Sequence, residues 1–176
     1  VKAMHIDNNG YVYAGTSGGG IYRSIDNVES WQQVGVTAAQ VKKIAISPLN
    51  GNIFALVNGV SRSADNGQSW EPISNGINNL DIRTINIKND GTIFCGVGNW
   101  DIGVVYISTD NGNFWERSDN GLPDHDVSGI TFDLEGNIYV SIDYNGVYKS
   151  IDNGETWYRI GDVPSGKLEF NSHGDL

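Results

Sequence analysis

A motif that recurs four times constrains the fold of this chain more than any other feature. Segments 24–31, 63–70, 108–115 and 150–157 each place Ser, Asp and Trp at one spacing, Ser-x-Asp-x-x-x-x-Trp. Successive motif aspartates lie 39, 45 and 42 residues apart. Such a period indicates one supersecondary unit stacked repeatedly. The motif residues are Ser24, Asp26, Trp31, Ser63, Asp65, Gly67, Trp70, Ser108, Asp110, Gly112, Trp115, Ser150, Asp152, Gly154 and Trp157.

Each period reads as four short strands. In the second period, 41–46 and 59–63 show alternating apolar residues, 52–57 is largely apolar, and a fourth strand begins at Trp70. Gly- or Asn-containing turns follow the first strands. We predict an all-β fold, a β-propeller of four-stranded antiparallel blades. The predicted blades span approximately 1–40, 41–80, 81–125 and 126–164, and 165–176 reads as the first strand of a fifth.

The motif aspartate is predicted to be structural. Asp65 lies two residues before Gly67, so its carboxylate can accept hydrogen bonds from backbone N–H groups of its own turn. Gly67 can adopt a positive φ, and Trp70 can pack between blades. The alternative is a catalytic or calcium-binding role, but each turn lacks the further acidic ligands that calcium requires. We therefore expect neither a metal nor a cofactor.

The first copy of the motif departs from the pattern. Val28 stands where the other three copies have Gly. A β-branched residue disfavours positive φ, so this turn is predicted to be altered or looser.

The four motifs resemble the Asp-box, or bacterial neuraminidase repeat, Ser-x-Asp-x-Gly-x-Thr-Trp. The resemblance covers residues 1 to about 164. Asp-box propellers include sialidases, xyloglucan-active glycoside hydrolases, sortilin-type receptors and photosystem assembly factors. The resemblance therefore implies the fold and leaves the function open. We expect a secreted, periplasmic or cell-surface location in a bacterium.

In such a propeller the Asp-box turns lie on one face, so ligands are expected on the opposite face. Trp100 and Asp101 occupy the loop between the second and third strands of the third blade, which is longer than its counterparts in the other blades. They suit an aromatic platform for sugar or peptide, although Trp100 can equally fold over the rim of its own blade. Asp143 and Tyr144 occupy the equivalent loop of the next blade.

Charged residues near the predicted channel mouth give two further candidates. Arg83 falls at the start of a first strand, at the position that Lys2 and Lys42 hold in their blades. These cations can bind an anion or offset the acidic loops, and the sequence leaves both readings open. His125 lies between two aspartates, which suits either proton transfer or a solvated loop cluster.

Only part of a glycosidase site can be found. A sialidase-like site needs three convergent arginines, whereas Arg83 is the only one of five arginines predicted near the channel. Segment 142–149 is similar to the xyloglucanase segment that carries a catalytic Asp, which makes Asp143 a candidate. Glycoside hydrolysis needs a second carboxylate, and none is identifiable. We favour a binding or scaffold module for carbohydrate or protein over a glycoside hydrolase.

Composition excludes two classes of partner. The net charge of −10 argues against nucleic acid, whose binding depends on Lys and Arg at phosphates. No apolar run approaches the ~20 residues of a membrane helix, so membrane insertion is not expected. Cys95 lies in an apolar run and reads as a buried hydrophobe. Because 165–176 leaves a hairpin half built, we expect the ring to be completed by further blades or by a second copy.

Overall fold

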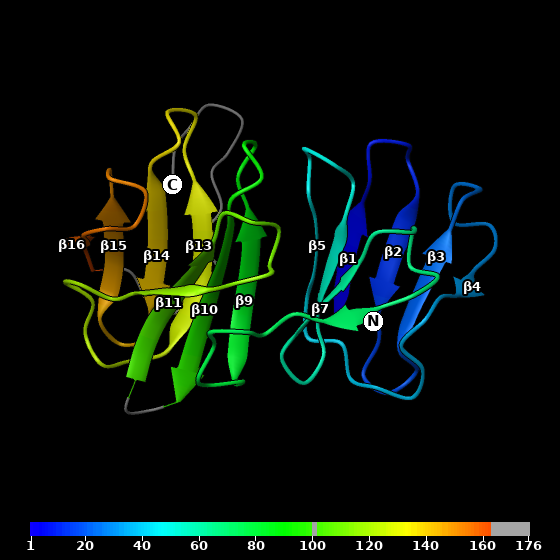
Figure 1. The fold of residues 1–176 in the computed structure, drawn as a ribbon, viewed down its shortest axis with the longest axis horizontal. Helices are drawn as coiled ribbons and strands as arrows, with labels where there is room; N and C mark the ends of the chain where they lie inside the picture. Colours follow the sequence, from blue (N-terminus) through cyan, green and yellow to red (C-terminus); the bar gives the residue numbers. More distant parts are fainter. Residues whose placement is uncertain (100–101, 163–176) are drawn as a thin grey trace.

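The computed structural model describes residues 1–99 and 102–162, and within them the regular structure is entirely β (Figure 1). The strands form four antiparallel sheets of four, each built from consecutive strands. We call these sheets blades 1 to 4 in chain order. The predicted all-β fold of four-stranded antiparallel blades is confirmed, whereas the extra strand predicted at 165–176 lies outside the described residues.

The strand bounds are as follows. Blade 1 contains β1 (Ala3–Ile6), β2 (Val12–Gly15), β3 (Ile21–Ser24) and β4 (Gln32–Gln33). Blade 2 contains β5 (Ile44–Ile46), β6 (Ile53–Leu56), β7 (Val60–Ser63) and β8 (Glu71–Pro72). Blade 3 contains β9 (Ile82–Ile87), β10 (Ile93–Asn99), β11 (Ile102–Ser108) and β12 (Glu116–Ser118). Blade 4 contains β13 (Val127–Phe132), β14 (Ile138–Ile142), β15 (Gly146–Ser150) and β16 (Tyr158–Gly161).

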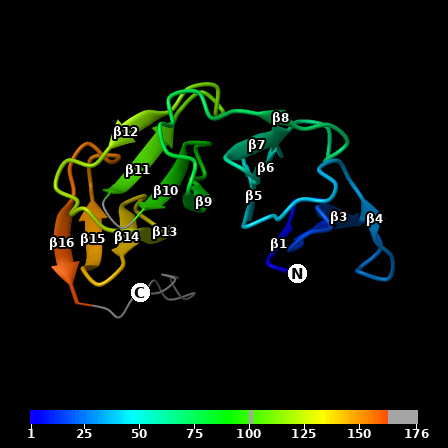
Figure 2. The same ribbon diagram turned by 90° about the horizontal axis from the view of Figure 1, so that it is seen from below.

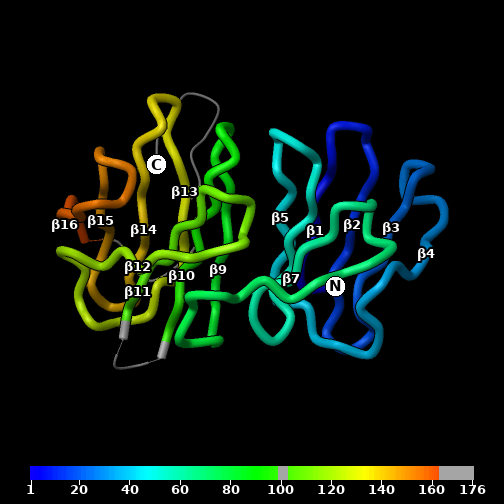
Figure 3. The backbone as a smooth tube through the Cα atoms, viewed as in Figure 1, coloured from blue at the N-terminus to red at the C-terminus, as the bar shows by residue number. Residues whose placement is uncertain are grey.

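The blades stand side by side in an arc (Figure 2). The first strands β1, β5, β9 and β13 lie on its inner side, and each contacts the next along the chain. The fourth strand of each blade lies outermost, and the chain then returns to the inner side to begin the next blade (Figure 3). Residues at the same repeat position in different blades therefore lie at the same level along the inner strands.

Strand β5 is shorter than the strand predicted at 41–46. The main chains of Lys42 and Lys43 both bond Leu56, since Lys42 N donates to the Leu56 carbonyl and Leu56 N donates to the Lys43 carbonyl. Sharing one partner residue breaks the regular ladder pairing before Ile44. The sequence pattern alone does not distinguish this arrangement from a continuous strand.

Apolar side chains fill the space between successive blades. Tyr13, Ile21 and Val34 of blade 1 pack with Ile44 and Ile53 of blade 2, and similar clusters lie between the later blades. Cys95 belongs to one of these clusters, and burial raises the pKa of its thiol well above the ordinary value. The described residues include no helix that is long and apolar enough to cross a membrane.

Candidate binding face

The four motif turns share one hydrogen-bond pattern. In blade 2, Ser63 Oγ donates to Asp65 Oδ1 (2.8 Å) and accepts from Gly67 N (2.8 Å). Asp65 Oδ1 also accepts from Ser69 N (2.8 Å), four residues on. The same serine-to-aspartate bond is made by Ser24, Ser108 and Ser150. The carboxylates are thus engaged within their own turns. We call these four turns, 24–31, 63–70, 108–115 and 150–157, the Ser-Asp turns.

The prediction of an altered first turn is wrong. Val28 adopts φ 67°, and Gly67 in the equivalent place has φ 87°. Val28 N donates to Ser24 Oγ (3.0 Å), as Gly67 N does to Ser63. The side-chain bonds of Ser24 and Asp26 therefore hold a β-branched residue in the left-handed region, where such residues are strained.

The Ser-Asp turns and the charged candidates lie at opposite ends of the strands. The turns follow β3, β7, β11 and β15. Arg83 lies near the start of β9, which in an antiparallel sheet is the end where β10 finishes and β11 begins. We call this end the loop face.

Cations from three blades line one cavity on the loop face. Lys2, Lys42, Lys43 and Arg83 border a space of about 220 Å³ between the inner strands, and we call them the cationic cluster. Two carboxylates partly balance them. Asp81 bonds Lys42 Nζ (2.9 Å) and Arg83 Nη2 (3.3 Å), and the Lys42 bond is the main cause of a lowered Asp81 pKa. Four cations against two carboxylates leave the cavity positive within an acidic chain.

The second carboxylate belongs to Asp126, which lies buried just before β13. Its Oδ2 accepts from Arg83 Nη2 (2.9 Å), and its Oδ1 has no hydrogen-bond partner among the described residues. Gly98 makes this packing possible, because a Cβ there would lie 2.5 Å from Arg83 Nε and 2.7 Å from Asp126 Cγ. Any larger residue at position 98 would displace the ion pair.

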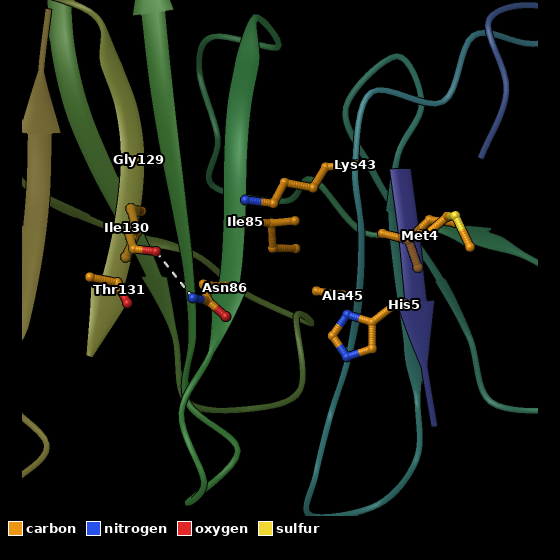
Figure 4. A pocket seen from close by; sticks show the side chains of 10 residues that line it. Met4, His5, Lys43, Ala45, Ile85, Asn86, Gly129, Ile130 and Thr131 are labelled. Atoms are coloured by element: carbon orange, nitrogen blue, oxygen red, sulfur yellow. Dashed lines mark hydrogen bonds between the residues drawn. The ribbon is translucent and has the colours of Figure 1, made fainter. Parts of the chain in front are cut away.

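A second cavity, of about 280 Å³, continues from the cationic cluster along the inner surface (Figure 4). It is lined by His5 of β1, Lys43 before β5, Asn86 of β9 and Thr131 of β13. Asn86 Nδ2 donates to the Ile130 carbonyl (3.1 Å) and joins two inner strands. Burial lowers the pKa of His5, so its imidazole is neutral at physiological pH. Polar side chains thus line the groove that extends from the cationic cluster along the inner strands.

The remaining predicted candidates are placed as follows. Trp100 and Asp101 lie outside the described residues. Asp143 is half-buried, and its N–H donates to the Asp126 carbonyl (2.9 Å), which joins its loop to the Arg83–Asp126 pair. Tyr144 is 80% exposed with φ 62°. His125 is half-buried, and its N–H donates to the Pro123 carbonyl.

Sequence reasoning missed three residues of this face. Lys43 follows Lys42 and carries the same charge, but it does not hold the repeat position of Lys2, Lys42 and Arg83 on which the prediction was based. Asp126 was considered only as a neighbour of His125. Gly98 gave no signal, because its close contact with Arg83 and Asp126 joins segments about 15 and 28 residues away.

No protein family and no curated protein matches the sequence. Among solved structures, the GH74 enzyme of Niastella koreensis superposes with a TM-score of 0.78 at 20% identity, over 99% of this chain and 32% of that chain. The GH74 xyloglucanase of Xanthomonas campestris gives 0.74 at 16% identity, over 88% and 29%. The structure described as YCF48 bound to D1 peptide gives 0.63 at 16% identity, over 93% and 52%.

The fold is that of a β-propeller. At these identities the likeness shows the fold alone. The chain spans about a third of each GH74 chain and about half of the YCF48 chain. Within this fold, the cationic cluster brings residues of three blades to one cavity on the loop face.

Proposed function

We propose that this β-propeller of the Asp-box type is a binding module, and that the cationic cluster holds a carboxylate-bearing segment of a protein ligand. The observation that carries the proposal is the convergence of Lys2, Lys42, Lys43 and Arg83 on one cavity in a chain of net charge −10. Clefts lined by one sign of charge concentrate ligands of the opposite sign.

The charges favour an acidic ligand over a neutral glycan. A neutral oligosaccharide gains nothing from an excess of cations, whereas a carboxylate forms charge-assisted hydrogen bonds with lysine and arginine. The polar groove below the cluster can accept the rest of an extended segment. A solved structure of this fold, YCF48, is described with a bound peptide. That precedent supports a peptide as one class of ligand that the fold can carry.

The Arg83–Asp126 pair gives the cluster a fixed geometry. Asp126 is buried and holds one edge of the guanidinium, and Asp81 holds Arg83 and Lys42 together. Side chains ordered before binding lose less conformational entropy when a ligand arrives. Lys2 and Lys42 remain accessible to a ligand at the rim.

Binding of a short oligoglutamate peptide, followed by amide chemical shifts, tests the proposal. We expect shifts at Lys42, Lys43 and Arg83, and weaker binding as salt is added. Lys42→Gln and Lys43→Gln should each weaken binding about two- to fivefold, the effect of one solvent-exposed ion pair. Arg117→Gln is the matched control, because this exposed arginine lies on the outer strand β12. Equal weakening by the control, or shifts confined to other faces, would contradict the proposal.

A glycoside hydrolase role is the alternative, with Asp143 as one carboxylate. It predicts hydrolysis of xyloglucan or β-glucan oligomers that is lost in Asp143→Ala. Binding of a neutral xyloglucan oligosaccharide at the loop face, unaffected by Lys42→Gln and Lys43→Gln, would likewise favour the carbohydrate reading over ours.

A further inference from the structure

The inner strand of blade 3 contains a β-bulge. Ile82 pairs with Val97 and Thr84 pairs with the adjacent Gly96, which leaves Arg83 as an extra residue in the inner strand. Such a bulge places two residues of one strand opposite one residue of its partner and redirects a side chain. In a regular strand, consecutive side chains point to opposite faces. Here Arg83 and Thr84 border the same cavity, the one that holds the cationic cluster.

Blade 4 has a bulge at the same repeat position. Val127 pairs with Ile142 and Gly129 pairs with the adjacent Ser141, which leaves Ser128 as the extra residue. Ser128 lies four residues before the end of β13, as Arg83 lies four residues before the end of β9. The two blades therefore share one irregularity of the main chain.

Blades 1 and 2 place two residues opposite one at this position as well. Lys2 and Lys42 lie four residues before the ends of β1 and β5. The Lys42 N–H donates to the Leu56 carbonyl (3.0 Å), and the Lys2 N–H donates to the Gly15 carbonyl (2.8 Å). Leu56 and Gly15 each also pair with the next residue of the inner strand. We call Lys2, Lys42, Arg83 and Ser128 the bulge residues.

The four bulge residues converge on one cavity. All of them border the space of about 220 Å³ on the loop face. Three carry a positive charge, whereas Ser128 presents a neutral hydroxyl. Because β-bulges commonly redirect side chains beside functional sites, we expect all four positions to face a ligand, including the one that lacks a charge.

Ser128 is oriented by the neighbouring strand and lies beside the charged residues. Its Oγ is 3.0 Å from Ser141 Oγ and 3.3 Å from the Ser141 carbonyl oxygen. A hydroxyl has one proton and two lone pairs, so Ser128 Oγ can accept from the Ser141 hydroxyl and still donate its own proton. Asp126, two residues before Ser128, binds Arg83 Nη2 (2.9 Å) and so joins the bulges of blades 3 and 4.

We propose that Ser128 is a further ligand contact of the cationic cluster, and that its hydroxyl donates to the carboxylate that Lys42 and Arg83 hold by charge. Asp81 already bonds both Lys42 and Arg83, which shows that one carboxylate can reach the two cations. A carboxylate has about four lone-pair sites, so it can also accept from a hydroxyl. The role rests on the proposed function, because it requires a ligand carboxylate at this cluster.

Calorimetric titration with a short oligoglutamate peptide at several salt concentrations tests the contact. Ser128→Ala should weaken binding about two- to tenfold, the effect of one hydrogen bond, and should leave the salt dependence unchanged because no charge is removed. Ser128→Lys gives blade 4 the charge that the other bulge residues carry. It should tighten binding several-fold and make the salt dependence steeper.

Two control variants separate a ligand contact from a structural role and from overall charge. Ser141→Ala removes the hydrogen bond between the two serines but keeps the Ser128 hydroxyl, so it should change binding less than Ser128→Ala does. Asn8→Lys adds the same charge as Ser128→Lys at an exposed position in the turn between β1 and β2, at the opposite end of the strands. It should leave both affinity and salt dependence nearly unchanged. Circular dichroism verifies that each variant is folded.

The outcomes distinguish this contact from the proposed function. If Ser128→Ala binds as tightly as the unaltered chain while Lys42→Gln and Lys43→Gln weaken binding, the cationic cluster stands and the Ser128 contact is wrong. If the lysine variants also bind unchanged, both are wrong. Equal weakening by Ser141→Ala, or a salt dependence of Ser128→Lys no steeper than that of Asn8→Lys, likewise overturns the contact.

Discussion

At the scale of single residues, the Ser-Asp turn fixes its own conformation through side-chain hydrogen bonds. Ser24 and Asp26 make the same bonds as their counterparts even though Val28 replaces glycine. The turn chemistry of Ser and Asp therefore outweighs the preference of one residue. The sequence pattern was sufficient to predict that the aspartate accepts hydrogen bonds within its own turn. It was not sufficient to predict that these bonds outweigh the backbone strain at Val28.

Val28→Gly is expected to stabilise the folded monomer by about 1 kcal/mol. A non-glycine residue in the left-handed region costs about 1–3 kcal/mol, and the greater entropy of glycine in the unfolded chain offsets part of the gain. Gly112→Val is the matched reverse change, and it should destabilise because the new side chain would also meet Ile73. Urea unfolding measures both. A destabilised Val28→Gly would show that the φ of 67° carries little strain.

The motif carboxylates predict an acid-sensitive contribution to stability. Hydrogen bonds, first from the hydroxyl four residues after each aspartate (Ser30, Ser69 and Thr156), lower the pKa of Asp26, Asp65 and Asp152 to about 2. Because the folded pKa lies below the unfolded one, these groups stabilise the fold above about pH 4, and this contribution is lost as pH falls toward 2. Stability should therefore decrease across that window.

Blade 3 provides an internal comparison for this effect. Phe114 replaces the hydroxyl residue, and the lowered pKa of Asp110 comes first from the Phe114 N–H. Phe114→Ser should lower the Asp110 pKa further, and Ser69→Ala should raise that of Asp65. Carboxyl NMR titration measures both shifts. An unchanged Asp110 pKa in Phe114→Ser would contradict the assigned role of the hydroxyl.

At the scale of elements, contacts between blades join segments some 40 to 50 residues apart. Arg62 illustrates this, since its Nη1 reaches the carbonyl of Asn111 and the side chain of Asn113 in the next blade. Its Nε and Nη2 also bind Glu71 of β8. The side chain is 13% exposed, so it is shielded from water that would otherwise compete for these bonds.

Arg62→Ala is expected to destabilise the fold by about 2 kcal/mol, the typical loss for hydrogen bonds that involve a charged group. Arg62→Lys should recover part of the loss, because it keeps the charge but not the planar set of donors. Arg117→Ala is the control, since Arg117 is 52% exposed and pairs with Asp119 beside its own strand. It should cost less than about 1 kcal/mol. Equal losses at the two sites would remove the special role of the contact between blades.

The difference between local and distant contacts explains what the sequence could predict. The repeat period, the alternation within strands and the turn residues are local, and they predicted four antiparallel blades. The loop face and the approximate positions of Arg83, Lys2 and Lys42 followed from the repeat register. The Arg83–Asp126 ion pair and the close packing of Gly98 against it could not be predicted from the repeat register, because both depend on how closely two blades approach. Repeat register does not determine that distance.

At the scale of the whole molecule, stability should vary along the arc of blades. In a stacked repeat each unit is stabilised by its neighbours. Blades 2 and 3 are flanked on both sides, whereas blade 1 is flanked only by blade 2. The contrast is clearest at the inner strands, where Met4 and Ile6 of β1 are exposed and Ile85 and Ile87 of β9 are buried.

Hydrogen exchange of the two inner strands measures this gradient. In dilute solution, amides of β1 should exchange faster than those of β9, because strands with few buried apolar contacts open at lower free energy. Both strands pair with one neighbour within their blades, β2 and β10, so backbone pairing is matched. Equal protection of β1 and β9 in dilute solution would contradict the gradient.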